Sequence, residues 1–248
     1  MDVLSYGGGR QTVAMAILIK RGVLPRPDRV VIADTGREAR STWAYLDAYT
    51  RPLLATVGLD VEIASHDLAT VDLYGHNGTL LLPVWTETGK FTAYCSGEWK
   101  KAVIRRYLRG QGVGPETRVT NWIGYAWDER RRIKGEDTGP WLRRFPLIEL
   151  GLTKADCQII IADEGLPLPP SSSCWMCPHR SNAEWRHVRD NLPEQWQEAI
   201  ALDEEIRETD ERHAVYLHQS RVPLALADLD APDRREPMRQ CSLGLCMV

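Results

Sequence analysis

Residues 5–12, with the sequence SYGGGRQT, have the composition of a loop that binds phosphate. Glycines let a backbone approach an anion without hindrance from Cβ, and the first N–H groups of a following helix point toward that anion. The hydroxyl of Ser5 or Thr12 can donate a hydrogen bond to a phosphate oxygen, and Arg10 can neutralise charge. The same glycines could form a tight turn between a strand and a helix without any ligand, so the motif alone leaves both interpretations open.

Five of the six cysteines stand in loop-like contexts, and two of these form a C-x-x-C motif. Cys174 and Cys177 are followed by Pro178 and His179, and two thiolates at this spacing in a turn can hold a metal ion or a cluster. The spacing is compatible with zinc, with an iron–sulfur cluster or with a redox pair. Cys157 differs because it lies in an apolar, helix-like segment, so we expect it in the core.

Two further cysteines, Cys241 and Cys246, flank Gly244 close to the end of the sequence. Chain termini are usually disordered unless something holds them. The pattern therefore suggests a tail that returns to the site, where it supplies a metal ligand or a mobile thiol. The alternative is that both cysteines are exposed thiols without a function.

The pattern of apolar residues predicts strands that alternate with helices, which is typical of a doubly wound, mostly parallel α/β sheet. Strands are expected at 3–5, 29–33, 61–64 and 118–124, and helices at 11–21, 42–54, 99–108, 153–164 and 193–211. The stretch 65–92 is expected to be irregular. We predict a nucleotide-binding α/β domain over residues 1–150 and a helical, cysteine-bearing extension over 151–248, packed as one unit.

Polar residues follow two of the predicted strands, at the edge where doubly wound sheets bind ligands. Asp34, Thr35 and Arg37 stand at the end of the second strand, and Gly124 stands at the end of the fourth. A run of arginines comes after the fourth strand, at Arg130, Arg131, Arg132, Arg143 and Arg144. These arginines can bind phosphate or a nucleic-acid backbone, or they can form a solvated surface with the acidic residues among them.

In their order and spacing these pieces resemble the adenine-nucleotide α-hydrolase superfamily, and within it the phosphoadenylylsulfate (PAPS) reductase-like family of PP-loop proteins. The loop of that family reads approximately S-x-G-G-x-D-S, and its second strand ends in D-T-G. A C-T-x-x-x-K element, an I-G-x-x-x-x-E-x-x-R strand end and a P-L-I-x-W segment follow. The matching segments here are 5–12, 34–36, 95–100, 123–132 and 146–149. The resemblance covers residues 1–180 and implies a HUP-like fold.

The resemblance implies that the chain binds ATP or a related adenylyl nucleotide together with Mg²⁺. Asp34 would hold Mg²⁺ or the ribose, while Lys100 and Arg37 would stabilise charge that develops in the reaction. The implied nucleotide-binding residues are Ser5, Gly7, Gly8, Gly9, Arg10, Gln11, Thr12, Asp34, Thr35, Gly124 and Arg132.

The resemblance also gives the cysteines a role. In adenylylsulfate reductases, a Cys-Cys pair and a later C-x-x-C together hold a [4Fe–4S] cluster, which implies that Cys95, Cys174 and Cys177 are ligands here. Ser96 replaces the second cysteine of the pair. A fourth ligand would come from Cys241 or Cys246, or the fourth iron would be open to a substrate sulfur. The alternative is a structural zinc, held by Cys95, Cys174, Cys177 and either His179 or Cys241.

The sequence departs from the family pattern in two places. Where the loop usually has Asp or Lys followed by Ser, this chain has Arg10, Gln11 and Thr12. Thr12 keeps a hydroxyl, but the acidic or lysine function is missing, so nucleotide binding is expected more firmly than ordinary pyrophosphate cleavage. The E-C-G-(I/L)-H tail of the reductases is absent, which argues against a sulfate-assimilation reductase.

Composition excludes some classes of protein. The chain has 248 residues, of which 43% are hydrophobic, and this is enough to bury a full core. A net charge of -3 argues against a globally basic nucleic-acid-binding protein. We recognise no signal peptide after Met1, and no apolar stretch approaches the roughly 20 residues that span a bilayer. We therefore expect a cytoplasmic protein with no membrane partner.

Three functional hypotheses follow. The first is an enzyme that adenylates an acceptor, a nucleobase of tRNA or DNA, and then transfers sulfur to it from a cluster-bound or thiol sulfur donor. The second is a PAPS reductase-like oxidoreductase that uses Cys246 as nucleophile and a thiol reductant as partner. The third is a non-catalytic nucleotide-binding module with a structural zinc. The oligomeric state is unknown at this point.

Overall fold

The computed structural model describes residues 1–65, 73–75, 77–135, 137, 139–209 and 214–233. The chain forms two compact units. The first unit comprises Met1–Leu73 and Cys95–Ser172, and the second comprises Tyr74–Tyr94 and Ser173–Val248.

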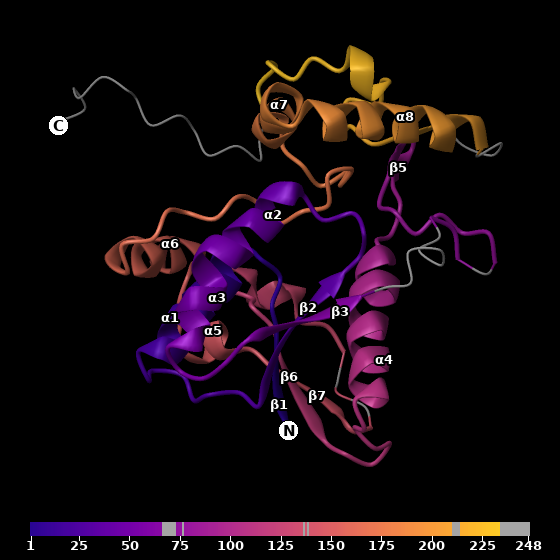
Figure 1. Ribbon diagram of the computed structural model, residues 1–248. Coiled ribbons are helices and arrows are strands. Elements are labelled where there is room, and N and C mark those ends of the chain that lie inside the picture. Colours follow the sequence, from indigo (N-terminus) through magenta and orange to yellow (C-terminus); the bar gives the residue numbers. More distant parts are fainter. Residues whose placement is uncertain (66–72, 76, 136, 138, 210–213, 234–248) are drawn as a thin grey trace, which may run out of the picture. The chain divides into compact units, whose positions relative to one another are not determined.

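A five-stranded, all-parallel sheet lies at the centre of the first unit (Figure 1). Its strands are β1 (Asp2–Ser5), β2 (Arg29–Asp34), β3 (Val61–Ser65), β6 (Val119–Trp122) and β7 (Trp141–Arg144), in the order β3-β2-β1-β6-β7. The predicted parallel α/β fold is therefore confirmed. The chain progresses from β1 to β3 on one side and continues from β6 on the other, so the order reverses between β1 and β6. Open α/β sheets bind ligands beyond the carboxyl ends of strands at such a point.

Helices cover both faces of this sheet (Figure 1). One face carries α1 (Arg10–Lys20), α3 (Arg51–Ala55), α5 (Pro146–Glu149) and α6 (Lys154–Asp163). The other carries α4 (Ala102–Gly110), which continues a π-helical turn, η3 (Ser96–Lys101). The short 3-10 helix η4 (Trp127–Arg132) follows β6. These elements match the predicted alternation of strands and helices.

The helix predicted at 42–54 is one continuous helical run that changes type along its length, from α2 (Arg40–Tyr45) through the π-helical η1 (Leu46–Thr50) to α3. Pro52 lies in the first turn of α3. Proline has no N–H to donate to the residue four positions earlier, so an ordinary α-helical bond is missing here. The wider turn that precedes the proline is consistent with this loss.

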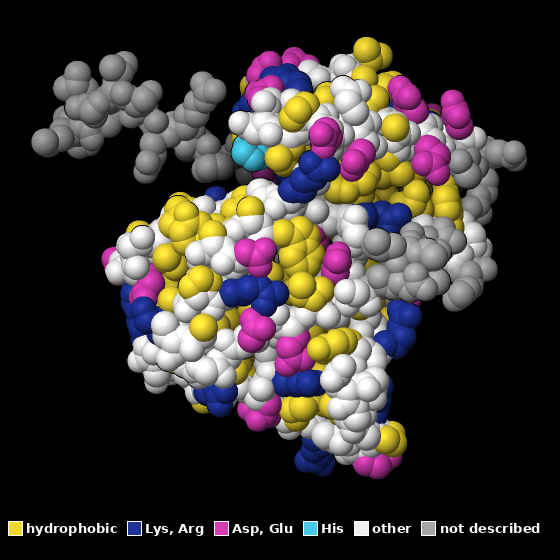
Figure 2. Space-filling model, viewed as in Figure 1, with side chains coloured by type: hydrophobic (Ala, Val, Ile, Leu, Met, Phe, Trp, Pro, Cys, Tyr) yellow, Lys and Arg dark blue, Asp and Glu magenta, His cyan; other side chains and the backbone are white. Residues whose placement is uncertain are grey.

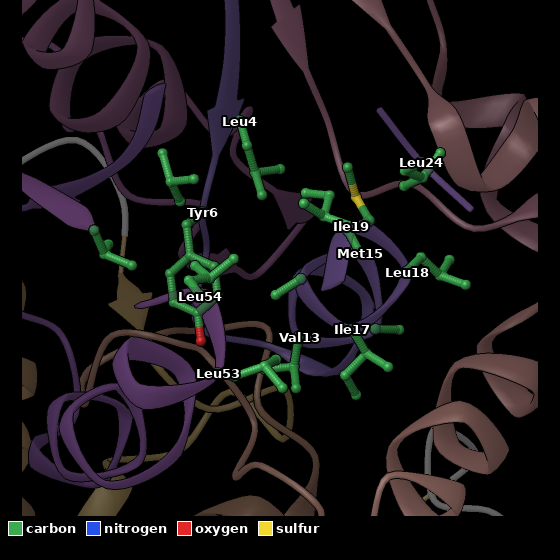
Figure 3. Packing of buried hydrophobic residues seen from close by; sticks show 14 of the residues in the cluster. Leu4, Tyr6, Val13, Met15, Ile17, Leu18, Ile19, Leu24, Leu53 and Leu54 are labelled. Carbon is green, nitrogen blue, oxygen red and sulfur yellow. The ribbon is translucent and has the colours of Figure 1, made fainter. Parts of the chain in front are cut away.

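Helix α1 is buried along almost its whole length, from Thr12 to Ile19. Leu4, Val13, Met15 and Ile17 belong to the cluster of apolar side chains that surrounds it (Figure 3). Tyr6 also points into this cluster, and its hydroxyl lies 2.7 Å from that of Thr50. Burial raises the pKa of Tyr6.

Cys157 of α6 lies in the same core, as predicted, and is fully buried. Burial raises the pKa of its thiol to about 12, so the thiol stays protonated at neutral pH. A buried, protonated thiol is a small apolar side chain and not a metal ligand.

The second unit combines a small antiparallel sheet with two helices. The sheet is formed by β5 (Gly89–Lys90), β4 (Trp85–Thr86) and β8 (Val215–Tyr216), in that order. The helices are α7 (Asn182–Asn191) and α8 (Pro193–Thr209), and a 3-10 turn, η5 (Leu224–Leu226), follows. Asp203 of α8 is buried and accepts hydrogen bonds from the N–H groups of Leu217 and Leu224, which ties the segment 217–224 to α8.

The bounds of the two units differ from the predicted domains, 1–150 and 151–248. Helix α6 packs on α1 and so belongs to the first unit. The stretch 65–92, predicted to be irregular, contributes β4 and β5, and β4 pairs with β8 in the second unit. Strands of two residues leave no alternating pattern in a sequence, which explains why they were not predicted. Among the described residues, no helix is long and apolar enough to cross a membrane.

Candidate functional site

A cavity of about 510 Å³ lies in the first unit, beyond the carboxyl ends of β1 and β6. Ser5 at the end of β1 and Asn121 of β6 both line it, and the hydroxyl of Ser5 donates a 2.6 Å hydrogen bond to the Asn121 side chain. The two strands on either side of the reversal in strand order are thus joined at the cavity floor. Predicted nucleotide-binding residues that line the cavity are Ser5, Gly7, Gly9, Gln11, Thr12, Gly124 and Arg132.

The three glycines of the loop meet different requirements. Gly8 has a φ of 70°, which favours glycine, and an added Cβ would lie 2.3 Å from Cγ2 of Thr42. An added Cβ on Gly9 would lie 2.5 Å from Oγ of Ser172. At Gly7, in contrast, an added Cβ would meet no atom within 4 Å, although the residue lines the cavity. The contacts of the fold therefore explain why positions 8 and 9 require glycine. At position 7, a ligand that approaches the backbone would explain the requirement.

The cavity lies at the N-terminal end of α1. Gly9 is the N-cap of this helix and has no side chain with which to cap the first turn. The first turn contains no acidic residue, so the partial positive charge of the helix end is not offset there. The Thr12 hydroxyl donates to the carbonyl of Gly9 at 3.1 Å. Backbone N–H groups, more than the Thr12 hydroxyl, are therefore the donors that an anion would meet.

Glu129 of η4 connects three parts of the site. Its side chain accepts hydrogen bonds from Gln11 at 3.0 Å and from Arg132 at 2.7 Å, and its Oε1 lies 3.1 Å from Nζ of Lys154. Burial would raise the pKa of Glu129, but the hydrogen bonds from Lys154 and Arg132 outweigh it and hold the pKa below its ordinary value. Glu129 is thus a buried carboxylate that fixes Gln11 of the glycine loop.

Basic side chains outnumber acidic ones around the cavity. The acids are Glu38 and Glu129, and the bases are Lys100, Lys101, Arg132, Lys134 and Arg143. Lys100 forms an ion pair with the buried Glu38, with 2.5 Å between the charged atoms. Such an excess of positive charge within a partly enclosed site favours an anionic ligand. On the face shown in Figure 2, basic and acidic side chains are interspersed over the first unit.

One wall of the cavity is aromatic. The rings of Tyr125 and Phe145 are stacked, with their centroids 5.7 Å apart, and the guanidinium of Arg132 lies 4.5 Å from the Tyr125 centroid. Ile123 and Ile133, which are close in sequence to Tyr125 and Arg132, also line the cavity. Flat, apolar surfaces of this kind accept a planar aromatic group such as a nucleobase.

Other predicted site residues do not line the cavity. Arg10 is exposed in the first turn of α1. Asp34 accepts a 2.8 Å hydrogen bond from the N–H of Gly36, while Thr35 is buried and accepts one from the N–H of Arg37. The guanidinium of Arg37 lies 4.8 Å from the centroid of the Trp99 ring. The roles given to these residues, and the ligand role of Gly8, stay predictions.

The predicted metal ligands lie in both units. Cys95, at the start of η3, belongs to the first unit and directly precedes Ser96, which lines the cavity. Cys174 and Cys177 belong to the second unit, where the N–H of Cys177 donates to the carbonyl of Cys174 at 3.0 Å. Cys241 and Cys246 lie outside the described residues. Within the described part of either unit, no three His, Cys, Asp or Glu side chains form a group that could hold a metal ion.

The C-x-x-C turn is held by a buried arginine. Arg180 donates to the carbonyls of Cys174 and Ser173, in each case with a shortest distance of 3.1 Å. Met176, inside the turn, is fully buried, while the two cysteines are partly exposed. The turn therefore presents two thiols on a rigid frame, as a two-cysteine half of a metal or cluster site would.

Several cavity residues were not predicted, namely Glu38, Asn121, Tyr125, Lys134 and Phe145. Of these, Asn121 had the clearest signal in the sequence, because it is a polar residue near the apolar end of a predicted strand. Glu38 follows the D-T-G segment by two positions, and its burial beside Lys100 could not be read from that spacing. The remaining three come from loops whose course depends on the fold of the whole unit.

The chain was compared with known proteins. No protein-family model and no curated protein sequence matches it. Among solved structures, it is similar to the U34-tRNA thiolase NcsA from Methanococcus maripaludis, determined with its [4Fe-4S] cluster. The identity is 14%, the match covers 85% of this chain and 72% of that one, and the TM-score is 0.43. A likeness of this size identifies neither the family nor the activity of this chain.

Substitution of the loop glycines should separate folding from ligand binding. Gly8→Ala should lower the free energy of unfolding by more than the roughly 1–2 kcal/mol that a left-handed φ costs, because the methyl group also meets Thr42. Gly22→Ala is the matched control, since Gly22 has a similar φ of 71° but open space around it. Gly7→Ala should leave stability within about 0.5 kcal/mol and weaken nucleotide binding. Urea unfolding and calorimetric titration with ATP measure the two effects, and equal ATP affinity of Gly7→Ala and the wild type would contradict this assignment.

Glu129→Gln should destabilise the protein in a pH-dependent way. The substitution removes the charge that pairs with Arg132 and Lys154 and turns one accepting oxygen of the buried group into an NH2 donor, which costs about 1–3 kcal/mol. Because the pKa of Glu129 is lowered in the folded state, its stabilisation is fully present above the ordinary value of 4.5 and is lost as the pH falls through the folded-state value. Urea unfolding at a series of pH values should show a difference from the wild type that shrinks below pH 4.5. Glu149→Gln, which removes an exposed partner of Arg144, should have little effect at any pH.

Proposed function

We propose that this chain binds ATP or a related adenylyl nucleotide in the cavity beyond β1 and β6, and that it activates an acceptor for sulfur transfer. One observation carries the proposal. An open glycine position, the uncapped end of α1 and an excess of basic side chains surround a single cavity at the point where the strand order reverses. Each of these features favours a phosphate-bearing ligand of nucleotide size.

The arrangement of the cavity supports a particular orientation of the nucleotide. The phosphates would lie against Gly7 and the end of α1, with Lys100 on the opposite side. The base would lie against the aromatic wall formed by Tyr125 and Phe145. Mg²⁺ would arrive with the phosphates and keep several of its waters, and Asp34 is the proposed ligand for it or for the ribose.

The proposed reaction has two balanced steps. In the first, a carbonyl oxygen of the acceptor, a nucleobase of tRNA or DNA, attacks the α-phosphorus of ATP, and pyrophosphate leaves. In the second, hydrosulfide attacks the activated carbon and AMP leaves with the former carbonyl oxygen, so that C=O becomes C=S without a change in oxidation state. Lys100 would stabilise charge on the phosphates in the first step, and helix α1 would hold them in place.

A [4Fe–4S] cluster held by Cys95, Cys174 and Cys177, with Cys241, Cys246 or an open iron as the fourth site, is part of the proposal. When bound, such a cluster would supply a position for the sulfur to be transferred. The turn at Cys174 supports this assignment, because Arg180 fixes its backbone while both thiols remain partly exposed. A zinc ion in the same place is the alternative.

A nucleotide-binding module without catalysis is the second candidate function. It is favoured by the hydrogen bonds that Gln11 and Thr12 form within the protein. Side chains used in this way do not reach a phosphate until they are released from their present partners. Binding that depends on the backbone would persist, while catalysis that depends on these side chains would not.

Calorimetry with ATP and Mg²⁺ tests nucleotide binding. Lys100→Met should weaken the affinity, because it removes a positive charge from the cavity, whereas Arg118→Met should not, because Arg118 is exposed and does not line it. Pyrophosphate release is then measured with ATP, sulfide and mixed tRNA or DNA. Pyrophosphate release would support the sulfur-transfer enzyme. ATP binding without pyrophosphate release would support the non-catalytic nucleotide-binding module. An absence of nucleotide binding would overturn both.

Metal content tests the cysteines. Protein purified without oxygen should contain about four iron per chain with matching sulfide, as for a cysteine-held [4Fe–4S] cluster. The double variant Cys174→Ser, Cys177→Ser should lose the iron. Cys157→Ala should keep it, because Cys157 is a buried core residue. One zinc and no iron would replace the cluster with a structural zinc site.

A further inference from the structure

A second cavity, of about 200 Å³, lies beside α4 in the first unit. Its floor is formed by β6 and β7, with Val119 and Trp141 among the lining residues, and its wall is formed by Ile104 and Leu108 of α4. These are apolar surfaces. A space of this size can accept one planar base, and it is too small for a folded partner or a duplex.

This second cavity adjoins the larger cavity beyond β1 and β6, which is proposed to bind the nucleotide and is called the nucleotide cavity below. The two share five lining residues, which are Lys101, Ile104, Asn121, Ile123 and Arg143. Arg143 is fixed at the boundary, because its backbone N–H and its guanidinium both bond to Asp137, and the guanidinium also donates to the carbonyls of Lys134 and Gly135. A ligand in the second cavity would therefore lie next to a nucleotide in the first.

Basic side chains recur from the end of η3 along α4, and two of them, Lys101 and Arg105, line the second cavity. Lys101, Arg105 and Arg109 recur every four residues, which places them about 6 Å apart along the helix. The guanidinium groups of Arg105 and Arg109 lie 5.1 and 5.5 Å from the centroid of the Trp141 ring. Among the described residues, no carboxylate forms an ion pair with Lys101 or Arg105.

The role of Trp141 follows from this geometry. An arginine over an aromatic ring is held by its planar face, and N–H groups at its edge can still donate to a ligand. The guanidinium of Arg109 also donates to the carbonyls of Val113 at 3.1 Å and Pro115 at 3.4 Å, whereas among the described residues Arg105 has no such acceptor. Evenly spaced cations without acidic partners match the regular negative charges of a phosphodiester backbone. An adjacent apolar space matches a base, and this combination is how proteins bind single strands.

We propose that α4 and the second cavity form a track for a single-stranded segment of nucleic acid, whose backbone follows Lys101, Arg105 and Arg109. One base occupies the second cavity, and the neighbouring nucleotide reaches the nucleotide cavity. The identity of this segment as the acceptor rests on the proposed function, but its binding does not. Arg105 is the residue that distinguishes the track, because it lines the second cavity and not the first.

Fluorescence anisotropy with labelled single-stranded RNA, single-stranded DNA and duplex DNA, at several salt concentrations, tests the track. Arg105→Gln should weaken single-strand binding several-fold and reduce the slope of log K against log salt by about 0.7, as for one lost phosphate contact. Arg106→Gln is the matched control, since Arg106 is an exposed arginine of the same helix that does not line the cavity. It should leave both quantities unchanged. The RNA and DNA arms identify which strand is bound.

Three outcomes would overturn the track. The first is the absence of salt-dependent binding by the wild-type protein, and the second is equal weakening by Arg105→Gln and Arg106→Gln. The third is duplex binding as tight as single-strand binding. Calorimetry with ATP, on the wild type and on the same Arg105→Gln protein, distinguishes failure of the track from failure of the proposed function. If Arg105→Gln binds ATP normally and also binds single strands as tightly as the wild type, the track alone is overturned. If the wild-type protein binds single strands but not ATP, the proposed function alone is overturned.

Discussion

The burial of helix α1 is the constraint on which the rest of the first unit depends. Every residue from Thr12 to Ile19 is buried, so the helix cannot slide or rotate without exposing apolar surface on one side or another (Figure 3). Its N-terminal end is therefore fixed beyond β1, beside the position where the strand order reverses. A helix end that faces a cavity without a capping side chain keeps its N–H groups and its partial positive charge available. The core that stabilises the unit thus also orients the group most suited to bind an anion.

Glu129 links the fixed end of α1 to the rest of the site through hydrogen bonds and ion pairs. The buried carboxylate of Glu129 connects the loop after β6 to α1 through Gln11 and to α6 through Lys154. Asp128 adds a second bond to α6, since it accepts from the N–H of Lys154 at 3.2 Å. A buried charge is tolerated only when it is well paired, and here three side-chain donors and the backbone N–H of Ala126 surround Glu129. Arg132 is one of these donors, and the same guanidinium lies over the ring of Tyr125 in the aromatic wall. Glu129 therefore contributes both to the position of that wall and to the charge balance of the cavity.

The sequence allowed prediction of those features that arise from local patterns. The strands β1, β2 and β3 are continuous or alternating apolar runs, and the loop at Gly7, Gly8 and Gly9 has a local signature. Strand β7 was missed because it contains Arg143 and Arg144 at the edge of the sheet, where half-buried polar residues hide the apolar pattern. Glu38 and Asn121 reach the cavity from different segments, and only the strand order brings them together. Arg10 shows the converse, since it belongs to the motif but is exposed at the first position of α1.

The departures of the loop from the family pattern have a different meaning once the loop is seen in place. An anion at this site would be bound mainly by backbone N–H groups, which every residue type except proline supplies. The change to Arg10, Gln11 and Thr12 therefore leaves the basis of binding intact. Gln11 is used instead to fix Glu129, and Thr12 is used to bond Gly9. Steps that require a particular side chain at these positions are the ones that such changes would alter. The proposed nucleotide binding and nucleotide cleavage are thus separable, and the binding has the stronger physical basis.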